Sequence, residues 1–261
     1  MIYDLQKGSL LKRASAFLLD GILLVIVAVG FAFALSAILD YNRYSDIYSE
    51  GIRRYSEEYD INFEDIVTEA QFNALTEEQS QNYEAAINAM NEDLEILNAL
   101  NAIVRMIVAI ASVSFFLAFL VIEYILPLIF KNGQTVGKKV FGLGVMRSNG
   151  VRVRPISLFA RTFLGKYVVE TMIPVLVAMM IIFNAIGVMP SPGLFGPILV
   201  VLLLIAQIVL VAATKTNSMI HDIVSDCVVV DLASQMIFDS EQAMIDYKAK
   251  KAAEEAARSP Y

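Results

Sequence analysis

Apolar residues follow one another in four long runs, with polar residues gathered between them. The runs are residues 14–39, 103–130, 168–188 and 194–213. Each matches or exceeds the roughly 20 apolar residues that cross a bilayer as a helix. Buried helices of soluble proteins are rarely so long and so uniformly apolar. The pattern predicts an all-α membrane protein with four transmembrane helices.

The polar insert between the first two runs, residues 40–102, carries two apolar stripes with helical spacing. One stripe runs into the second span through Tyr83, Ile87, Met90, Leu94, Leu97, Asn101 and Val104. The other leaves the first span through Tyr44, Tyr48, Ile52, Tyr55 and Tyr59. Stripes with this spacing pack helices against each other. We therefore predict an extracytoplasmic helical hairpin, with residues 62–76 at its tip.

The segment between the second and third runs, residues 131–167, contains three local signals. Residues 133–139 form a glycine-containing turn, and Ser148-Asn149-Gly150 predicts a small β-hairpin within residues 140–153. Pro155 then opens an amphipathic stretch, residues 156–167, that suits a helix lying in the membrane interface. The C-terminal tail, residues 214–261, is charged and alanine-rich beyond Ser234, which indicates a further helix.

Charge along the chain predicts its orientation. Residues 40–95 hold fifteen of the 27 acidic residues, whereas residues 131–166 hold eight Lys or Arg and no acid. Basic loops stay on the cytoplasmic side. We therefore place both termini and residues 131–166 in the cytoplasm, and residues 40–101 and 189–193 on the outer side of the membrane.

Composition excludes several classes of protein. Hydrophobic residues make up 57% of the 261, too many for an ordinary soluble domain. Nucleic acid is not expected as a partner, because the sequence has no basic stripe interleaved with aromatic residues. A single histidine and a single cysteine, Cys227, leave no multi-histidine metal site and no internal disulfide. A cleaved signal peptide is disfavoured because Asp20 interrupts its apolar core. We expect no cofactor.

Four polar motifs flank these runs in a fixed order. They are Arg13 with Asp20, the turn Gly133-x-Thr135-x-Gly137-Lys138, Asn149-Gly150 followed by Arg161, and His221-Asp222. In this order they resemble the RDD family of bacterial membrane proteins, over about residues 11–230 apart from the insert. The resemblance implies a membrane fold and little about activity, because ion transport has been suggested for some members and regulation of membrane partners for others. The long insert departs from the family's commoner short first loop.

Asp20 is the most informative of these polar residues. It lies seven residues after Arg13, on the same helix face and about 10.5 Å along the axis. A carboxylate within a span costs about 2.5–3.5 kcal/mol on insertion scales, so it should face protein or water. Either Asp20 is an ion or proton site, or it is clamped to a cation of the basic segment. We favour the clamp, with Arg161 as first partner and Lys138 as second.

The other polar residues leave alternatives open. Glu123 either extends the Asp20 cluster or reaches towards the cytoplasmic interface. The glycine turn has three residues between its glycines and Lys139 after Lys138, so it is not a nucleotide-binding loop. We expect Lys138 and Lys139 to contact anionic lipid. His221-Asp222 has no nucleophile motif beside it, so an enzyme is the least expected class.

Two functions remain. The first is a regulator or scaffold for another membrane or envelope protein, bound through the acidic hairpin. The alternative is an ion or small-solute transporter, with cation/proton exchange as one form, acting as a homo-oligomer. For both, the expected polar network comprises Arg13, Asp20, Glu123, Lys138, Arg161, His221 and Asp222.

Overall fold

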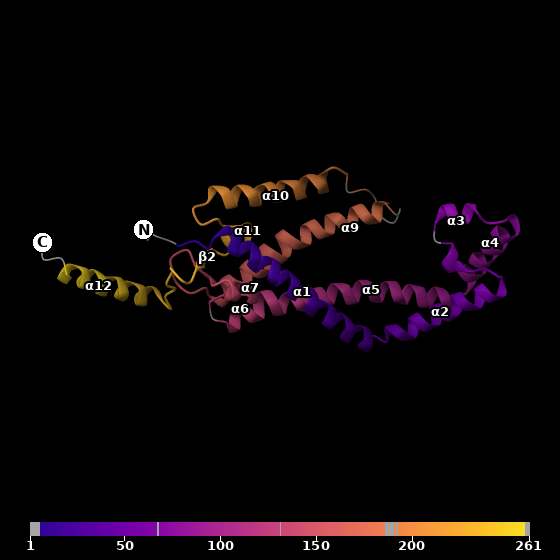
Figure 1. The fold of residues 1–261 in the computed structure, drawn as a ribbon, viewed down its shortest axis with the longest axis horizontal. Coiled ribbons are helices and arrows are strands. Elements are labelled where there is room, and N and C mark those ends of the chain that lie inside the picture. The colour runs from indigo at the N-terminus through magenta and orange to yellow at the C-terminus, as the bar shows by residue number, and fades with distance from the viewer. Residues whose placement is uncertain (1–5, 67, 131, 186–190, 192, 259–261) are drawn as a thin grey trace. The chain divides into compact units, whose positions relative to one another are not determined.

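The structure is a computed structural model that describes residues 6–66, 68–130, 132–185, 191 and 193–258. It is mostly helical and forms two compact units (Figure 1). The first unit combines Met1–Leu24 with Phe119–Tyr261, and the second is Val25–Ala118.

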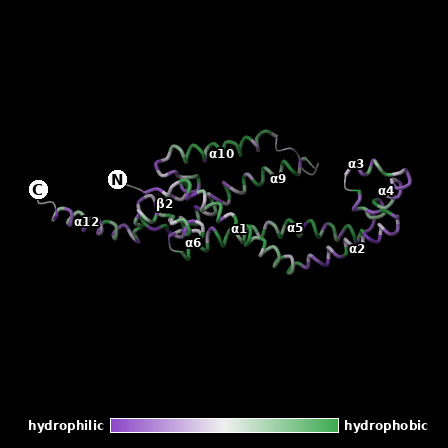
Figure 2. Tube along the Cα trace, viewed as in Figure 1, coloured by the Kyte–Doolittle hydropathy of each residue, from purple (hydrophilic) through white to green (hydrophobic). Residues whose placement is uncertain are grey.

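Four helices in the described part are long and apolar enough to cross a membrane. They are Leu10–Ile38, Leu94–Ile129, Pro155–Ile182 and Phe195–Ala213. The first is α1 and the last is α10, and the second consists of α5 (Leu94–Leu120), the π-helical η2 (Val121–Ile125) and α6 (Leu126–Ile129). Figure 2 shows these helices as mainly hydrophobic. The prediction of four apolar helices is confirmed.

The third apolar helix differs from its prediction. It runs without a break through α8 (Pro155–Phe159), the π-helical η3 (Ala160–Met172) and α9 (Ile173–Ala185). The sequence predicted a separate helix over residues 156–167 and a span from residue 168. Pro155 starts one continuous helix instead, because proline suits a first helical turn. Its position in the membrane interface stays a prediction, and the predicted outer loop 189–193 lies mostly outside the described residues.

A two-stranded antiparallel sheet lies in the first unit. Strand β1 (Leu143–Arg147) pairs with β2 (Cys227–Asp231), so that Leu143 lies opposite Asp231. The predicted turn is present, because Gly150 has φ +87° and the Arg147 N–H donates to the Val151 carbonyl at 2.9 Å. The predicted hairpin within residues 140–153 is present only as one antiparallel bridge, between Met146 and Arg152. Along its whole length, β1 pairs instead with β2, a strand about 80 residues later.

The sheet forms the core of the first unit. Its buried residues pack in two clusters, Ala16, Leu143, Val145, Val153, Leu158, Cys227 and Val229 in one, and Met146, Val228 and Val230 in the other. Two short helices precede the strands, α7 (Val136–Val140) and α11 (Ile220–Val224). The Gly8 N–H also donates to the Val229 carbonyl at 3.1 Å. The sheet thus holds together segments from the start, middle and end of the chain.

The second unit contains the acidic insert as helices. After α2 (Tyr41–Glu58) come η1 (Phe63–Asp65), α3 (Glu69–Asn73) and α4 (Glu77–Glu92). Thr68 with Gln71 and Thr76 with Gln79 form capping boxes that begin α3 and α4. The predicted tyrosine stripe of α2 is half-buried, as expected for a face that packs.

The second predicted stripe is interrupted at Asp93. This carboxylate accepts hydrogen bonds from the backbone N–H groups of Glu95 and Ile96, so α4 ends there and α5 begins. Ile96 is buried after the break, whereas Leu94 is 72% exposed. The stripe through Leu94 is therefore wrong, because the new helix start shifts the buried face.

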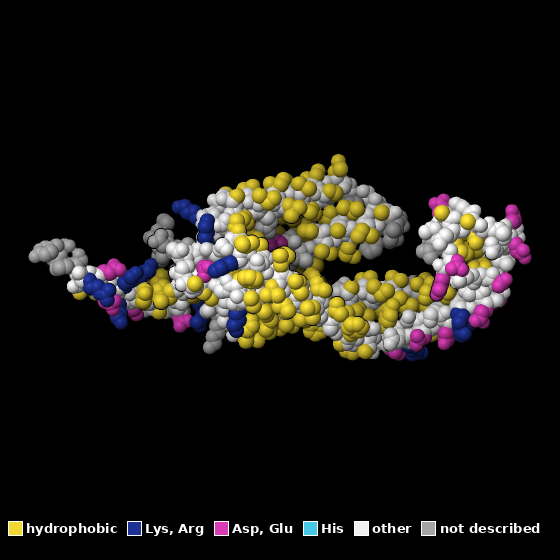
Figure 3. Space-filling view, viewed as in Figure 1, with side chains coloured by type: hydrophobic (Ala, Val, Ile, Leu, Met, Phe, Trp, Pro, Cys, Tyr) yellow, Lys and Arg dark blue, Asp and Glu magenta, His cyan; other side chains and the backbone are white. Residues whose placement is uncertain are grey.

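The C-terminal helix predicted beyond Ser234 is confirmed as α12 (Glu241–Arg258). Nearly all of its residues are exposed, and only Met244 is buried. Its charged residues are of both signs (Figure 3).

The orientation of the chain is tested by cysteine labelling. In a Cys227→Ser background, we expect an impermeant maleimide added to intact cells to modify Gln81→Cys in the acidic insert and to spare Arg154→Cys. Both positions are exposed, so reactivity reports the side of the membrane. Labelling of Arg154→Cys alone would contradict the predicted orientation.

Candidate functional site

Asp222 in α11 is the centre of a buried charged cluster. Its Oδ2 accepts a hydrogen bond from the Arg13 guanidinium at 3.1 Å, and its Oδ1 accepts two from Arg161 at 2.8 and 3.0 Å. Asp222 is fully buried, and both arginine side chains are less than a tenth exposed. Burial alone would raise the pKa of Asp222, but the neighbouring His221 and arginines hold it below its ordinary range. One carboxylate therefore joins α1, η3 and α11.

His221 lies between two carboxylates. Its Nδ1 is 2.8 Å from Glu170 Oε2, and its Nε2 is 3.3 Å from Asp222 Oδ1. Burial lowers the pKa of His221. Helix η3 approaches it closely at Gly165, where an added Cβ would lie 2.5 Å from the His221 Cα atom. Only glycine fits at this crossing.

The π-helical hydrogen bonding of η3 places two of these groups on one face. Arg161 and Glu170 are nine residues apart, which is about half a turn out of phase at the 3.6 residues per turn of an α-helix. A π-helix bonds over five residues and has more residues per turn. Both side chains consequently reach α11, where Arg161 binds Asp222 and Glu170 binds His221.

Asp20 is buried as predicted, being 3% exposed, but its partners are not the predicted cations. It accepts hydrogen bonds from the Thr135 hydroxyl at 2.5 Å and from the Gly137 backbone N–H at 2.7 Å. Among the described residues, no Lys or Arg nitrogen forms an ion pair with it within 4 Å. The first turn of α7 offers unpaired N–H groups to the carboxylate. The predicted clamp to Arg161 is therefore wrong.

Lys138 is a buried cation beside Asp20. It is 8% exposed, and its Nζ lies 3.2 Å from the Thr135 hydroxyl, with no carboxylate within 4 Å in the described part of the chain. Burial and the nearby Lys166 charge lower the pKa of Lys138 to about 7, although Glu123 and Asp20 act in the opposite direction. Its side chain is enclosed, so burial speaks against the predicted contact of Lys138 with anionic lipid, whereas the same contact for the exposed Lys139 stays a prediction. Asp20, Thr135 and Lys138 form one chain of hydrogen bonds.

Glu123 belongs to the same cluster. It is 7% exposed, and its Oε2 accepts a hydrogen bond from Lys166 Nζ at 2.6 Å. The Thr162 hydroxyl donates to the Glu123 carbonyl at 3.0 Å. Glu123 therefore extends the buried charged cluster, which is one of its two predicted alternatives, and does not reach out of it towards the interface.

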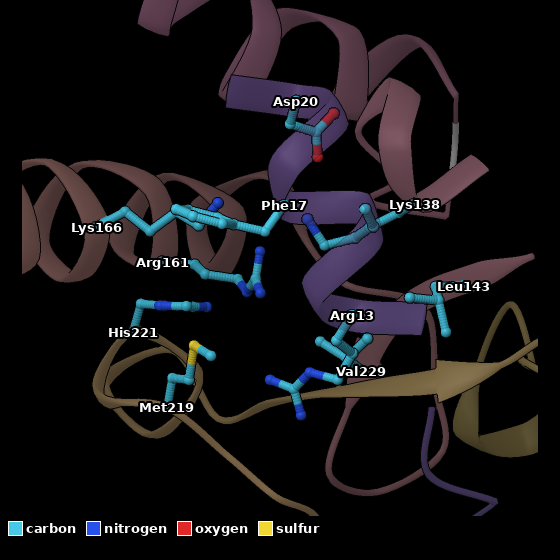
Figure 4. A pocket seen from close by; sticks show the side chains of 11 residues that line it. Arg13, Phe17, Asp20, Lys138, Leu143, Arg161, Lys166, Met219, His221 and Val229 are labelled. Carbon is cyan, nitrogen blue, oxygen red and sulfur yellow. The ribbon is translucent and has the colours of Figure 1, made fainter. Parts of the chain in front are cut away.

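These groups surround a cavity of about 50 Å³, which is room for a water molecule or a small ion (Figure 4). It is lined by Arg13, Ala16, Phe17, Asp20, Lys138, Leu143, Arg161, Lys166, Met219, His221 and Val229. Five of the seven predicted site residues line it, and Glu123 and Asp222 bind lining residues. No group of three potential metal ligands of the His, Cys, Asp or Glu type occurs among the described residues.

The sequence did not single out several members of the site. Lys166 and the pairing of Glu170 with His221 emerge only from the fold. Thr135 belongs to the turn motif, but its hydrogen bond to Asp20 also emerges only from the fold. The nine-residue spacing of Arg161 and Glu170 places them on one face of a π-helix but on opposite faces of an α-helix. The sequence therefore indicates their shared face only if η3 is read as a π-helix. Asn149-Gly150 contributes a turn and lies outside the cavity lining.

Comparisons with known proteins identify the family. The model described as RDD family matches residues 7–226, which include every predicted member of the polar cluster. The search of curated proteins and the search of solved structures found no match. With more than half of its length matched, the chain belongs to the RDD family.

Proposed function

We propose that this membrane protein exchanges a small cation for a proton, with Asp20 facing the cation and Lys138 carrying the proton. One observation supports this most strongly. Within the described chain, a single cavity is lined by a buried carboxylate without a cationic partner and a buried ammonium without a carboxylate partner. The Thr135 hydroxyl lies between them.

The other charged groups of the cluster form no ion pair with Asp20 or Lys138 among the described residues. They pair among themselves, Arg13 and Arg161 with Asp222, Lys166 with Glu123, and His221 with Glu170. When Lys138 loses its proton, the negative charge of Asp20 is uncompensated in a poorly hydrated site, and a cation is attracted. When Lys138 regains the proton, the cation is released. The two ions therefore compete because each keeps the site near neutrality.

Exchange across a membrane needs access to the site from both sides. Four helices are few for a solitary transporter, so we propose a homo-oligomer in the bacterial cell membrane with both termini cytoplasmic. The basic loops near the cluster support this orientation.

The proposal is tested by replacing Asp20 with asparagine. The purified protein in liposomes should move Na⁺ or K⁺ down a gradient, and Asp20→Asn should lower the rate about a hundredfold or more, since the cation loses the carboxylate that lines the cavity. Asp231→Asn is the control, because Asp231 pairs with Lys12 at a partly exposed site outside the cavity. Equal transport by Asp20→Asn and the wild type would contradict the proposal.

A second candidate, a regulator or scaffold, rests on the acidic insert. Its carboxylates gather on the surface of α2 to α4 (Figure 3), as expected for a surface that binds a basic partner. Crosslinking with mass spectrometry in native membranes should then find one partner repeatedly at this insert. The purified protein would transport no ion in that case.

A further inference from the structure

A second pocket lies in the first unit and shares no lining residue with the cavity at Asp20. Its volume is about 270 Å³. Pro127 and Leu128 of α6 contribute to one part of its wall, and Pro155 and Leu158 of α8 to another. Arg152 supplies its cationic group.

The four apolar residues fix the level of this pocket relative to a membrane. Pro127 and Leu128 stand at the end of the second apolar helix, and Pro155 and Leu158 stand at the start of the third. The segment that connects the two helices is basic, with six Lys or Arg and no acid in residues 131–154. The pocket therefore lies where the apolar interior of a bilayer gives way to its headgroups.

Arg152 has hydrogen-bond donors to spare. Its Nη2 atom lies 2.7 Å from Asp239 Oδ1. The Asp239 side chain is 74% exposed, so water weakens this ion pair. Its Nε is shielded and has no hydrogen-bond partner among the described residues. A guanidinium carries five N–H donors in a fork that fits phosphate oxygens.

We propose that this pocket binds the headgroup phosphate of a membrane phospholipid. Arg152 donates to the phosphate oxygens, and the glycerol and first methylene groups lie against Leu128 and Pro155. An anionic phospholipid is preferred over a zwitterionic one, because residues 131–154 carry six Lys or Arg and no acid, and the carboxylate paired with Arg152, Asp239, is screened by water.

Native mass spectrometry of the detergent-solubilised protein tests this site. With added phosphatidylglycerol, the wild type should carry one lipid more tightly than with phosphatidylcholine. Arg152→Gln should weaken that binding about tenfold, as expected when charge-assisted hydrogen bonds are lost. Leu128→Trp, which fills the pocket, should weaken it as well. Asp239→Asn breaks the same ion pair but keeps the guanidinium, and should bind at least as well as the wild type.

Three results would overturn the proposal. Undiminished lipid binding by Arg152→Gln would show that Arg152 does not bind the phosphate. Equal losses of lipid binding in Arg152→Gln and Asp239→Asn would mean that the ion pair stabilises the structure and that Arg152 does not contact the lipid. Inorganic phosphate or glycerol 3-phosphate that protects against heat as well as phosphatidylglycerol would identify a soluble anion instead. None of these readouts depends on ion transport.

Discussion

Replacing Asp222 with asparagine is expected to lower the free energy of unfolding by about 3–5 kcal/mol, the range for breaking a buried ion pair. The reason is that one buried carboxylate neutralises two buried guanidinium groups, Arg13 and Arg161. The amide cannot accept charge-assisted hydrogen bonds on both sides, so both cations would remain buried without a counter-charge. Thermal unfolding in detergent, followed by circular dichroism, measures the loss.

Asp226→Asn provides the matched control for this measurement. Asp226 is 60% exposed and lies 3.6 Å from Arg147, so its ion pair is screened by water. We expect a change of about 0–1 kcal/mol. If Asp222→Asn and Asp226→Asn unfolded at the same temperature, the buried cluster would not stabilise the fold.

Replacing Lys138 with methionine is expected to abolish proton coupling and to change how stability depends on pH. The pKa of Lys138 lies near 7 in the folded protein against an ordinary value of 10.5. Between these values the unfolded chain holds a proton that the folded chain lacks. Stability therefore rises with pH across this window, by up to about 1.4 kcal/mol per pH unit, and levels off below pH 7.

Melting temperatures between pH 6 and pH 10 measure this dependence. Lys138→Met should remove the part of the slope that comes from Lys138 and should be the more stable variant at pH 6, because it buries no charge. Lys139→Met is the control. Lys139 is the exposed neighbour of Lys138, so its replacement should leave the slope unchanged. An identical slope in Lys138→Met and wild type would show that Lys138 does not titrate in the folded protein.

The apolar runs and the burial of Asp20 could be predicted from sequence for one physical reason. The cost of leaving a carboxylate in lipid, or of exposing a long apolar helix to water, depends on residue type alone. The partner of Asp20 could not be predicted in this way. It depends on Thr135, the N-cap of α7, and a five-residue helix leaves little periodicity to detect.

Long-range pairing and unusual helix geometry explain the other differences. Strand β1 lies next to a good local turn, yet β2 provides five residues that pair with it over its whole length. Glu170 falls on the wrong face of an α-helix from Arg161, and only the π-helical η3 brings both to α11. At Asp93, a capping side chain ended a stripe that looked continuous.

Under the proposed function, Asp20 and Lys138 exchange a cation for a proton within one site. The most direct measurement is the response of an imposed pH gradient to added Na⁺ or K⁺ in liposomes that contain the purified protein and a pH-sensitive dye. The wild type should dissipate the gradient when the cation is added, and Lys138→Met should not, whereas Lys139→Met should behave as the wild type. A gradient that the cation leaves intact with the wild type, or that it dissipates equally with Lys138→Met, would contradict the proposed exchange.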